Sequence, residues 1–167
     1  MKNGIQSMDE LQTGHVSLNT PIGMLIVSAK DATVCSIRLA KADEQPIAQE
    51  NETQPVLKRA VRELHEYFAG ERTEFTFPMD GAGTPFQKSV WQALLQIPFG
   101  ETRTYGEIAS AVENPKGSRA VGMACNKNPI MIAVPCHRVV GAGGKLTGYA
   151  YGTELKQTLL DLEQHLE

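Results

Sequence analysis

The feature that most restricts the fold of this chain is a single change of pattern at residues 79–84, the glycine-rich stretch MDGAGT. Before it, short β-rich runs alternate with glycine, proline, asparagine and aspartate, which is typical of strands and hairpins. After it, apolar residues recur mainly at helical spacing. We therefore predict an α/β protein with two domains: a small β-rich α/β domain over residues 1–83, linker included, and a mainly helical domain over residues 84–167.

The N-terminal half contains candidate strands and one candidate helix. Apolar residues recur at helical spacing from Gln54 to Ala69, and Gly70 ends the pattern as a C′ glycine does. The sequence FTFPM, residues 75–79, is expected to add a strand. The other expected strands are His15 to Leu18, Met24 to Ser28 and Val34 to Leu39.

The C-terminal half opens with a well-marked helix. Thr84 can cap it, Pro85 suits its first position, and Gln87 completes a capping box. Its buried stripe is expected to consist of Phe86, Val90, Trp91, Leu94 and Leu95.

Two shorter helices are predicted next, from Thr104 to Val112 and from Ser118 to about Asn126, joined by the turn ENPKG. Two short helices and a glycine-containing turn outline a helix-turn-helix. A plain helical hairpin has the same outline, so DNA binding is one of two readings here.

Composition excludes several classes of protein. The chain has 167 residues, 41% hydrophobic, and its apolar runs are too short to cross a bilayer. The polar N-terminus MKNGIQSMDELQ does not resemble a secretory signal, so we expect a cytoplasmic protein. The net charge is −3, yet residues 103–138 hold five basic residues and two acidic ones. That stretch either faces phosphates or is a chance fluctuation.

The three cysteines, Cys35, Cys125 and Cys136, include no C-x-x-C pair, which argues against a disulfide framework and a zinc cluster. We expect no metal and no cofactor. Cys136 ends an apolar run in AVPCHRVVGAGG, and a working thiol there needs a base or a positive charge, for which His137 and Arg138 are candidates. In an extended strand adjacent side chains point to opposite faces, so contact with His137 needs a bend or a bridging water. An inert buried cysteine beside a surface histidine is the alternative.

The motif PCHRVV stands between NKNPIMIAVP and GKLTGYAYG, with LKQTLLDLE after it and GETRTYGEIASAVENPKGSRAVGMACNKNP upstream. This region, residues 84–163, resembles the active-site region of the O6-alkylguanine-DNA alkyltransferases, the methylated-DNA–protein-cysteine methyltransferases. The N-terminal half resembles the family only in outline, through TPIG and its flanking strands. The resemblance implies a C-terminal domain with a winged-helix-like helix-turn-helix.

The resemblance implies that Cys136 takes the alkyl group from guanine O6 in one displacement and keeps it as a thioether, so that each molecule acts once. His137 would be the base, acting through a bridging water, and Glu163, rather than its rival Asp161, would orient the imidazole. Tyr105 would donate to N3 of the departing guanine. Asn128 would brace the turn that carries the cysteine.

The same resemblance implies a substrate pocket and a DNA-binding helix. Tyr149 would line the alkyl pocket, Lys156 would lie near the leaving base, and backbone groups of Val139 and Ala150 would hold the guanine edge. Arg119 would enter the base stack as the nucleotide rotates out. The remaining predicted contacts with the minor groove or with phosphates are Ala120, Lys116, Lys127 and Tyr105. Tyr151, where many relatives carry glycine, should crowd the pocket mouth.

We therefore expect a monomer that repairs O6-alkylguanine in double-stranded DNA by direct transfer to Cys136. An alkylation-sensing helix-turn-helix regulator is the first alternative. A Cys-His thiol hydrolase is the second, although it would not need the basic stretch, Tyr105 or Arg119.

Overall fold

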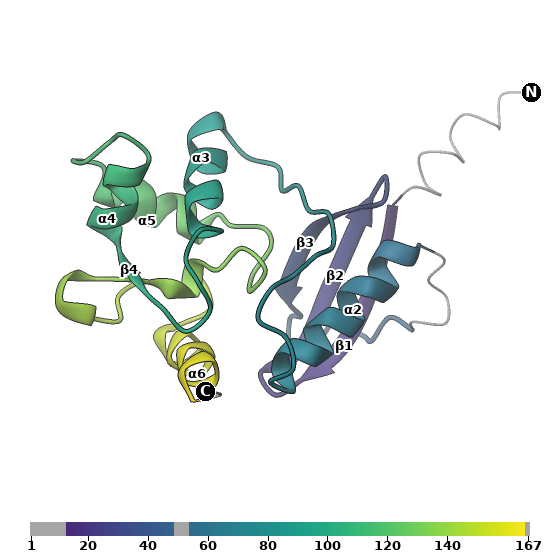
Figure 1. Cartoon of the computed structure of the whole chain (residues 1–167). Coiled ribbons are helices and arrows are strands. Elements are labelled where there is room, and N and C mark those ends of the chain that lie inside the picture. Colours follow the sequence, from purple (N-terminus) through teal and green to yellow (C-terminus); the bar gives the residue numbers. More distant parts are fainter. Residues whose placement is uncertain (1–12, 49–53, 166–167) are drawn as a thin grey trace, which may run out of the picture. The chain divides into compact units, whose positions relative to one another are not determined.

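The structure is a computed structural model, and it describes residues 13–48 and 54–165. The N-terminal stretch MKNGIQSMDELQ, whose sequence does not resemble a secretory signal, lies outside the described residues. The chain divides between Gly81 and Ala82 into two compact units, which are described separately below (Figure 1). The α/β class is confirmed, because the first unit is a sheet with a helix and the second is mainly helical.

The first unit is built on a three-stranded antiparallel sheet in the order β1-β2-β3. Its strands are β1 (Thr13–Thr20), β2 (Gly23–Lys30) and β3 (Thr33–Leu39). Two-residue turns join them, and Asp31 and Ala32 both adopt positive φ, as the twist of a tight hairpin demands. Alternate residues of β2, including the fully buried Leu25 and Val27, point into the core.

Helix α2 (Pro55–Phe68) packs against all three strands. Its apolar residues at helical spacing are buried, as the sequence predicted, except that Phe68 at the last position is half-buried. At its C-terminus the amide of Gly70, at φ +78°, donates to the carbonyl of Tyr67, and the amide of Glu71 donates to that of Glu66. This is the Schellman arrangement, and it confirms Gly70 as the C′ residue.

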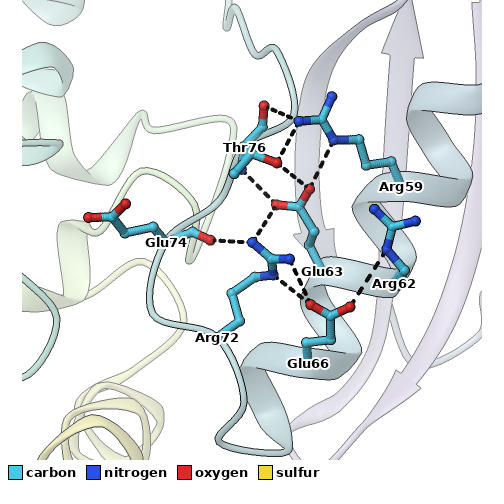
Figure 2. Close-up of polar contacts among 7 residues, drawn as sticks. All are labelled: Arg59, Arg62, Glu63, Glu66, Arg72, Glu74 and Thr76. Atoms are coloured by element: carbon cyan, nitrogen blue, oxygen red, sulfur yellow. Dashed lines mark hydrogen bonds and ion pairs between the residues drawn. The ribbon is translucent and has the colours of Figure 1, made fainter.

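A buried carboxylate on α2 anchors the segment that leaves this unit (Figure 2). Glu63 is fully buried and accepts hydrogen bonds from the amide and the hydroxyl of Thr76, at 2.6 and 2.7 Å. Arg59 lies 3.0 Å and Arg72 3.5 Å from the same carboxylate. Because a buried charge must be paired, these contacts fix residues 72–76 against α2.

The strand predicted at residues 75–79 is wrong. The segment makes only an isolated bridge between Val34 and Met79. Pro78 has no N–H to give to a ladder, and the amide of Thr76 is taken by Glu63.

The second unit begins with α3 (Pro85–Leu94), and the predicted capping box of Thr84 and Gln87 is present. The indole of Trp91 donates to the carbonyl of Ala124, 2.9 Å away on α5. Val90, Trp91 and Leu94 form the buried stripe, with Phe86 half-buried. Leu95 is 38% exposed, so its predicted burial is wrong, because the helix ends at Leu94 and the chain turns at its cap.

Helices α4 (Tyr105–Ala111) and α5 (Ser118–Asn126) pack against each other and against α3 (Figure 1). Strand β4 (Arg103–Thr104), just before α4, pairs in parallel with β5 (Val139–Val140). The short helical turns η2 (Cys136–Arg138) and η3 (Ala142–Gly144) flank β5, and α6 (Thr153–Gln164) follows. The β4-β5 pair thus brings the PCHR turn next to the start of α4.

Candidate functional site

The chain between α5 and η2 is a buried turn rather than a strand. Residues 130–134 are all buried, and Ile132 adopts φ +72°. Cys136, 5% exposed, opens the 3-10 turn η2. The backbone at Cys136 is therefore bent, so the rule that adjacent side chains of an extended strand point to opposite faces does not apply to Cys136 and His137.

Asn128 holds this turn at both ends. Its Oδ1 accepts from the amide of Ile130 at 2.9 Å, and its Nδ2 donates to the carbonyl of Val134 at 2.8 Å. The same Nδ2 lies 3.2 Å from the sulfur of Cys136. The predicted brace is therefore in contact with the thiol as well as with the backbone.

The thiol of Cys136 is protonated at rest. Burial raises its pKa, while the Nδ2 donor of Asn128 and the positive charge of Lys156 lower it, and burial dominates. A thiol in this state needs a base to become a nucleophile.

His137 and Glu163, both fully buried, form a hydrogen-bonded pair beside the thiol. The imidazole Nε2 lies 2.6 Å from Oε2 of Glu163. Burial lowers the pKa of His137 more strongly than the nearby Glu163 raises it, so the ring is neutral. Its Nδ1 is buried and, within the described residues, makes no hydrogen bond. Asp161, two residues from Glu163 on α6, instead accepts from Gln157.

No hydrogen bond joins the His137 ring to the Cys136 sulfur in the part of the chain described here. This geometry is compatible with the predicted bridging water. Arg138, considered above as an activator of the thiol, points elsewhere: its guanidinium binds Glu163 and the carbonyl of Ile97. Its Nε, Nη1 and Nη2 each donate to one of these acceptors, and none of these three hydrogen bonds reaches the thiol.

Tyr105, at the start of α4, and Lys156, on α6, meet at the loop after η3. The hydroxyl of Tyr105 donates to the carbonyls of Thr147 at 2.9 Å and Gly148 at 3.2 Å. The ammonium of Lys156, a fully buried residue, lies 3.1 Å from the first carbonyl and 3.4 Å from the hydroxyl. Burial raises the pKa of Tyr105 and lowers that of Lys156. Tyr105, the predicted donor to the leaving base, and Lys156, predicted to lie near that base, are therefore close together.

A groove of about 480 Å³ runs beside this cluster, between α5, the start of α4 and the loop. Arg119 is exposed on the groove wall, and Ala120 is half-buried on the same helix. Lys116 and Lys127 are exposed just before and just after α5. The residues lining the groove are Tyr105, Ser118, Arg119, Gly122, Met123, Asn126, Thr147 and Gly148. Arg119 and Tyr105 thus share one cavity.

The remaining predicted pocket residues lie on β5 and the loop before α6. Val139 is fully buried, Ala150 is exposed, and Tyr149 is half-buried. The hydroxyl of Tyr149 is buried and has no hydrogen-bond partner in residues 13–48 and 54–165. Tyr151 packs edge-on against Tyr149, with ring centroids 5.7 Å apart. Its crowding of the pocket mouth stays a prediction.

Sequence reasoning missed three features of the site. It did not foresee that Arg138 pairs with Glu163, that Thr147 carries the carbonyl shared by Tyr105 and Lys156, or that Met123 stands 69% exposed on the groove wall. Only the last had a signal, because Met123 lies one turn after Arg119 on the predicted helix. Among the described residues, no cluster of metal-ligating side chains occurs and no helix is long and apolar enough to cross a membrane.

Both units match known families. Residues 85–165 match the family model of the 6-O-methylguanine DNA methyltransferase DNA binding domain, and residues 15–81 match that of its ribonuclease-like domain. The methylated-DNA–protein-cysteine methyltransferase of Methanosarcina acetivorans is 49% identical over 146 residues, which cover 86% of this chain and 94% of that protein. The constitutive enzyme of that name from Bacillus subtilis is 44% identical, over 90% of this chain and 94% of its own length.

Solved structures of members of the same family resemble this chain in fold. The O6-methylguanine methyltransferase of Mycobacterium tuberculosis has a TM-score of 0.81 and 44% identity, covering 93% of this chain and 94% of that one. The same organism's protein in complex with DNA has the same TM-score and identity, covering 91% and 93%.

Proposed function

Since the chain belongs to the 6-O-methylguanine DNA methyltransferase family, a family of DNA repair enzymes, we propose that Cys136 is the residue that reacts. Its thiol takes the alkyl group from O6-alkylguanine in duplex DNA. The observation that carries this assignment is the placement of the buried Cys136 thiol, braced by Asn128, beside the His137–Glu163 pair. The protein acts as a monomer on double-stranded DNA, and the complex of the M. tuberculosis relative with DNA supports that partner.

The transfer is a single displacement. The thiol proton passes through a water molecule to Nδ1 of His137, whose Nε2–H is held by Glu163. The sulfur forms a bond to the alkyl carbon as the bond from that carbon to O6 breaks, and the electron pair goes to the guanine. Overall, the thiol hydrogen is replaced by the alkyl group and the guanine gains one proton. Because the cysteine thiolate is a poor leaving group from the thioether, the alkyl group stays on sulfur and each molecule reacts once.

Tyr105 and Lys156 serve the departing guanine. The hydroxyl of Tyr105 protonates N3, which meets the negative charge as it develops, and the imidazolium of His137 restores that proton through solvent. In the free protein this hydroxyl is occupied by the carbonyls of Thr147 and Gly148, so it must release them to reach the base. Tyr149, Val139 and Ala150 surround the alkyl group and the guanine edge.

The groove beside α5 receives the duplex. Extruding a base costs a few kcal/mol, and Arg119, exposed on the groove wall, fills the gap in the stack. Half-buried Ala120 lets the helix approach the minor groove closely, and Lys116 and Lys127 contact phosphates from either end of α5. Degenerate minor-groove readout suits a protein that meets damage in any sequence.

Intact-mass measurement after incubation with an O6-methylguanine duplex tests the proposal. We expect one methyl group per protein, located on Cys136 by peptide mapping, and no transfer by Cys136→Ser, because a hydroxyl is a much weaker nucleophile at neutral pH. Cys125→Ser is the matched control and should still accept the methyl group. Methyl transfer by Cys136→Ser would refute the assignment.

The same assay separates the alternatives. A thiol hydrolase would return repaired DNA and unmodified protein. An alkylation-sensing regulator would become methylated but would also discriminate strongly between undamaged sequences, with steep salt dependence. Each phosphate contact adds about 0.9 to the log–log salt slope on duplex DNA, so the few basic residues around α5 predict a shallow slope.

A further inference from the structure

The transfer described above leaves Arg138 without a role, although its environment is unusual for an arginine. The residue is 6% exposed. Its Nη1 donates to the carbonyl of Ile97 at 2.7 Å, and its guanidinium carbon lies 5.7 Å from the centroid of the Phe99 ring. An arginine held this far from water requires strong compensation from its partners.

The main partner of Arg138 is the carboxylate that also holds His137. Its Nε donates to Oε1 of Glu163 at 2.7 Å, and its Nη2 donates to Oε2 at 3.1 Å. Oε2 is the same atom that lies 2.6 Å from Nε2 of His137. A two-point fork of this kind prevents the carboxylate from rotating away from the imidazole.

The fork also fixes which nitrogen of His137 carries the proton. Burial raises the pKa of Glu163, but the hydrogen bonds from His137 and Arg138 and the guanidinium charge outweigh it and lower the pKa to about 2, so the carboxylate only accepts. Nε2 of His137 must then be the N–H donor. Nδ1 of the neutral ring keeps its lone pair and can receive the thiol proton.

The charges around His137 come from η2 and α6. Glu163 favours the imidazolium, Arg138 and Lys156 oppose it, and the Cys136 thiol is neutral at rest. Tyr149, from the loop before α6, is neutral as well. Without Arg138, the negative charge of Glu163 would act on the imidazole with less opposition, and a protonated ring cannot take a proton from the thiol.

We propose that Arg138 is a positioning residue for alkyl transfer: by gripping both oxygens of Glu163 it holds the imidazole of His137 in place and keeps that ring neutral, with Nδ1 ready to accept the thiol proton. The proposal rests on the proposed function of Cys136.

The first test is the pH dependence of the rate with free O6-benzylguanine, a substrate that needs no DNA contact. At low pH the rate should fall as His137 becomes protonated, and this fall is the acid limb of the pH–rate profile. In Arg138→Met the acid limb should move to higher pH by about one unit or more, which is the shift that loss of a charge within a few ångströms produces. Arg138→Lys keeps the charge but lacks the fork, so its limb should stay near that of the wild type while the rate falls several-fold. Arg103→Met, which removes an exposed arginine 3.3 Å from Glu101, should leave both unchanged.

The second test observes His137 directly. In a Cys136→Ser background, the ring-nitrogen NMR signals of His137 should titrate at higher pH when Arg138 is replaced by methionine, or by glutamine if the methionine variant does not fold. An unchanged acid limb and an unchanged titration, with only a loss of thermal stability, would show that Arg138 is merely structural. A wild type that transfers no alkyl group would overturn the proposed function, and the titration would still decide the role of Arg138.

Discussion

Asn128→Asp is the most informative single change in the site, because it preserves the shape of the side chain. The aspartate keeps an oxygen for the amide of Ile130, which Oδ1 of Asn128 accepts at 2.9 Å. It loses the N–H groups that reach the carbonyl of Val134 at 2.8 Å and the sulfur of Cys136 at 3.2 Å. It also places a negative charge next to the thiol.

The size of the effect follows from the lost donor. Asn128 lowers the pKa of Cys136, whereas a carboxylate in its place raises it. A hydrogen bond to a charged group contributes about 1.5–3 kcal/mol, so loss of the donor to the developing thiolate should slow transfer roughly 10- to 150-fold. The carbonyl of Val134 would keep the hydrogen bond from the amide of Cys136 at 2.8 Å, so loss of the Asn128 donor should lower the free energy of unfolding by about 0.5–1.5 kcal/mol.

The assay is the second-order rate constant with free O6-benzylguanine, followed by intact mass, with thermal unfolding measured in parallel. Asn114→Asp, an exposed asparagine of the same unit, is the control and should match the wild type. If Asn128→Asp reacts as fast as the wild type, Asn128 does not stabilise the thiolate. Loss of stability alone would leave it a purely structural brace.

Three further predictions address DNA binding and stability. Arg119→Ala should slow repair of duplex DNA much more than reaction with free O6-benzylguanine, since the free base needs no extrusion; equal losses would make Arg119 a pocket or folding residue. Glu63→Gln should cost the first unit about 1.5–3 kcal/mol in unfolding free energy, because the buried carboxylate loses its charge-assisted hydrogen bonds from Arg59 and Thr76 while both arginines, Arg59 and Arg72, stay partly exposed, whereas Glu66→Gln should cost about 1 kcal/mol or less in calorimetry. The folded-state pKa of Glu163 is about 2 against an ordinary 4.5, so its stabilisation is present above pH 4.5 and is lost as the pH falls toward 2. Glu163→Gln should therefore flatten the fall of the melting temperature in that range, and an equally steep fall in the variant would contradict this pKa.

Local signals in the sequence were sufficient for most elements. The capping box at Thr84, the glycine at position 70 and the alternation in the strands act within a few residues, so their consequences can be predicted without tertiary contacts. The motif PCHRVV indicated the family and the reaction, and the family matches confirm both. The segment 75–79 was mispredicted because its backbone donor is taken by a side chain from another element.

Tertiary structure decided the electrostatics of the site. Glu163 stands 26 positions from His137 and 25 from Arg138, and only the packing of α6 against η2 brings the three side chains together. The same holds for the carbonyl of Thr147, which lies 42 positions from Tyr105 and 9 from Lys156. Pattern and propensity describe neighbours along the chain, whereas a pKa depends on burial and on charges within a few ångströms in space. The sequence alone therefore indicated the family and predicted which thiol reacts, and the folded chain determined that this thiol rests protonated beside a neutral histidine held by a carboxylate and an arginine.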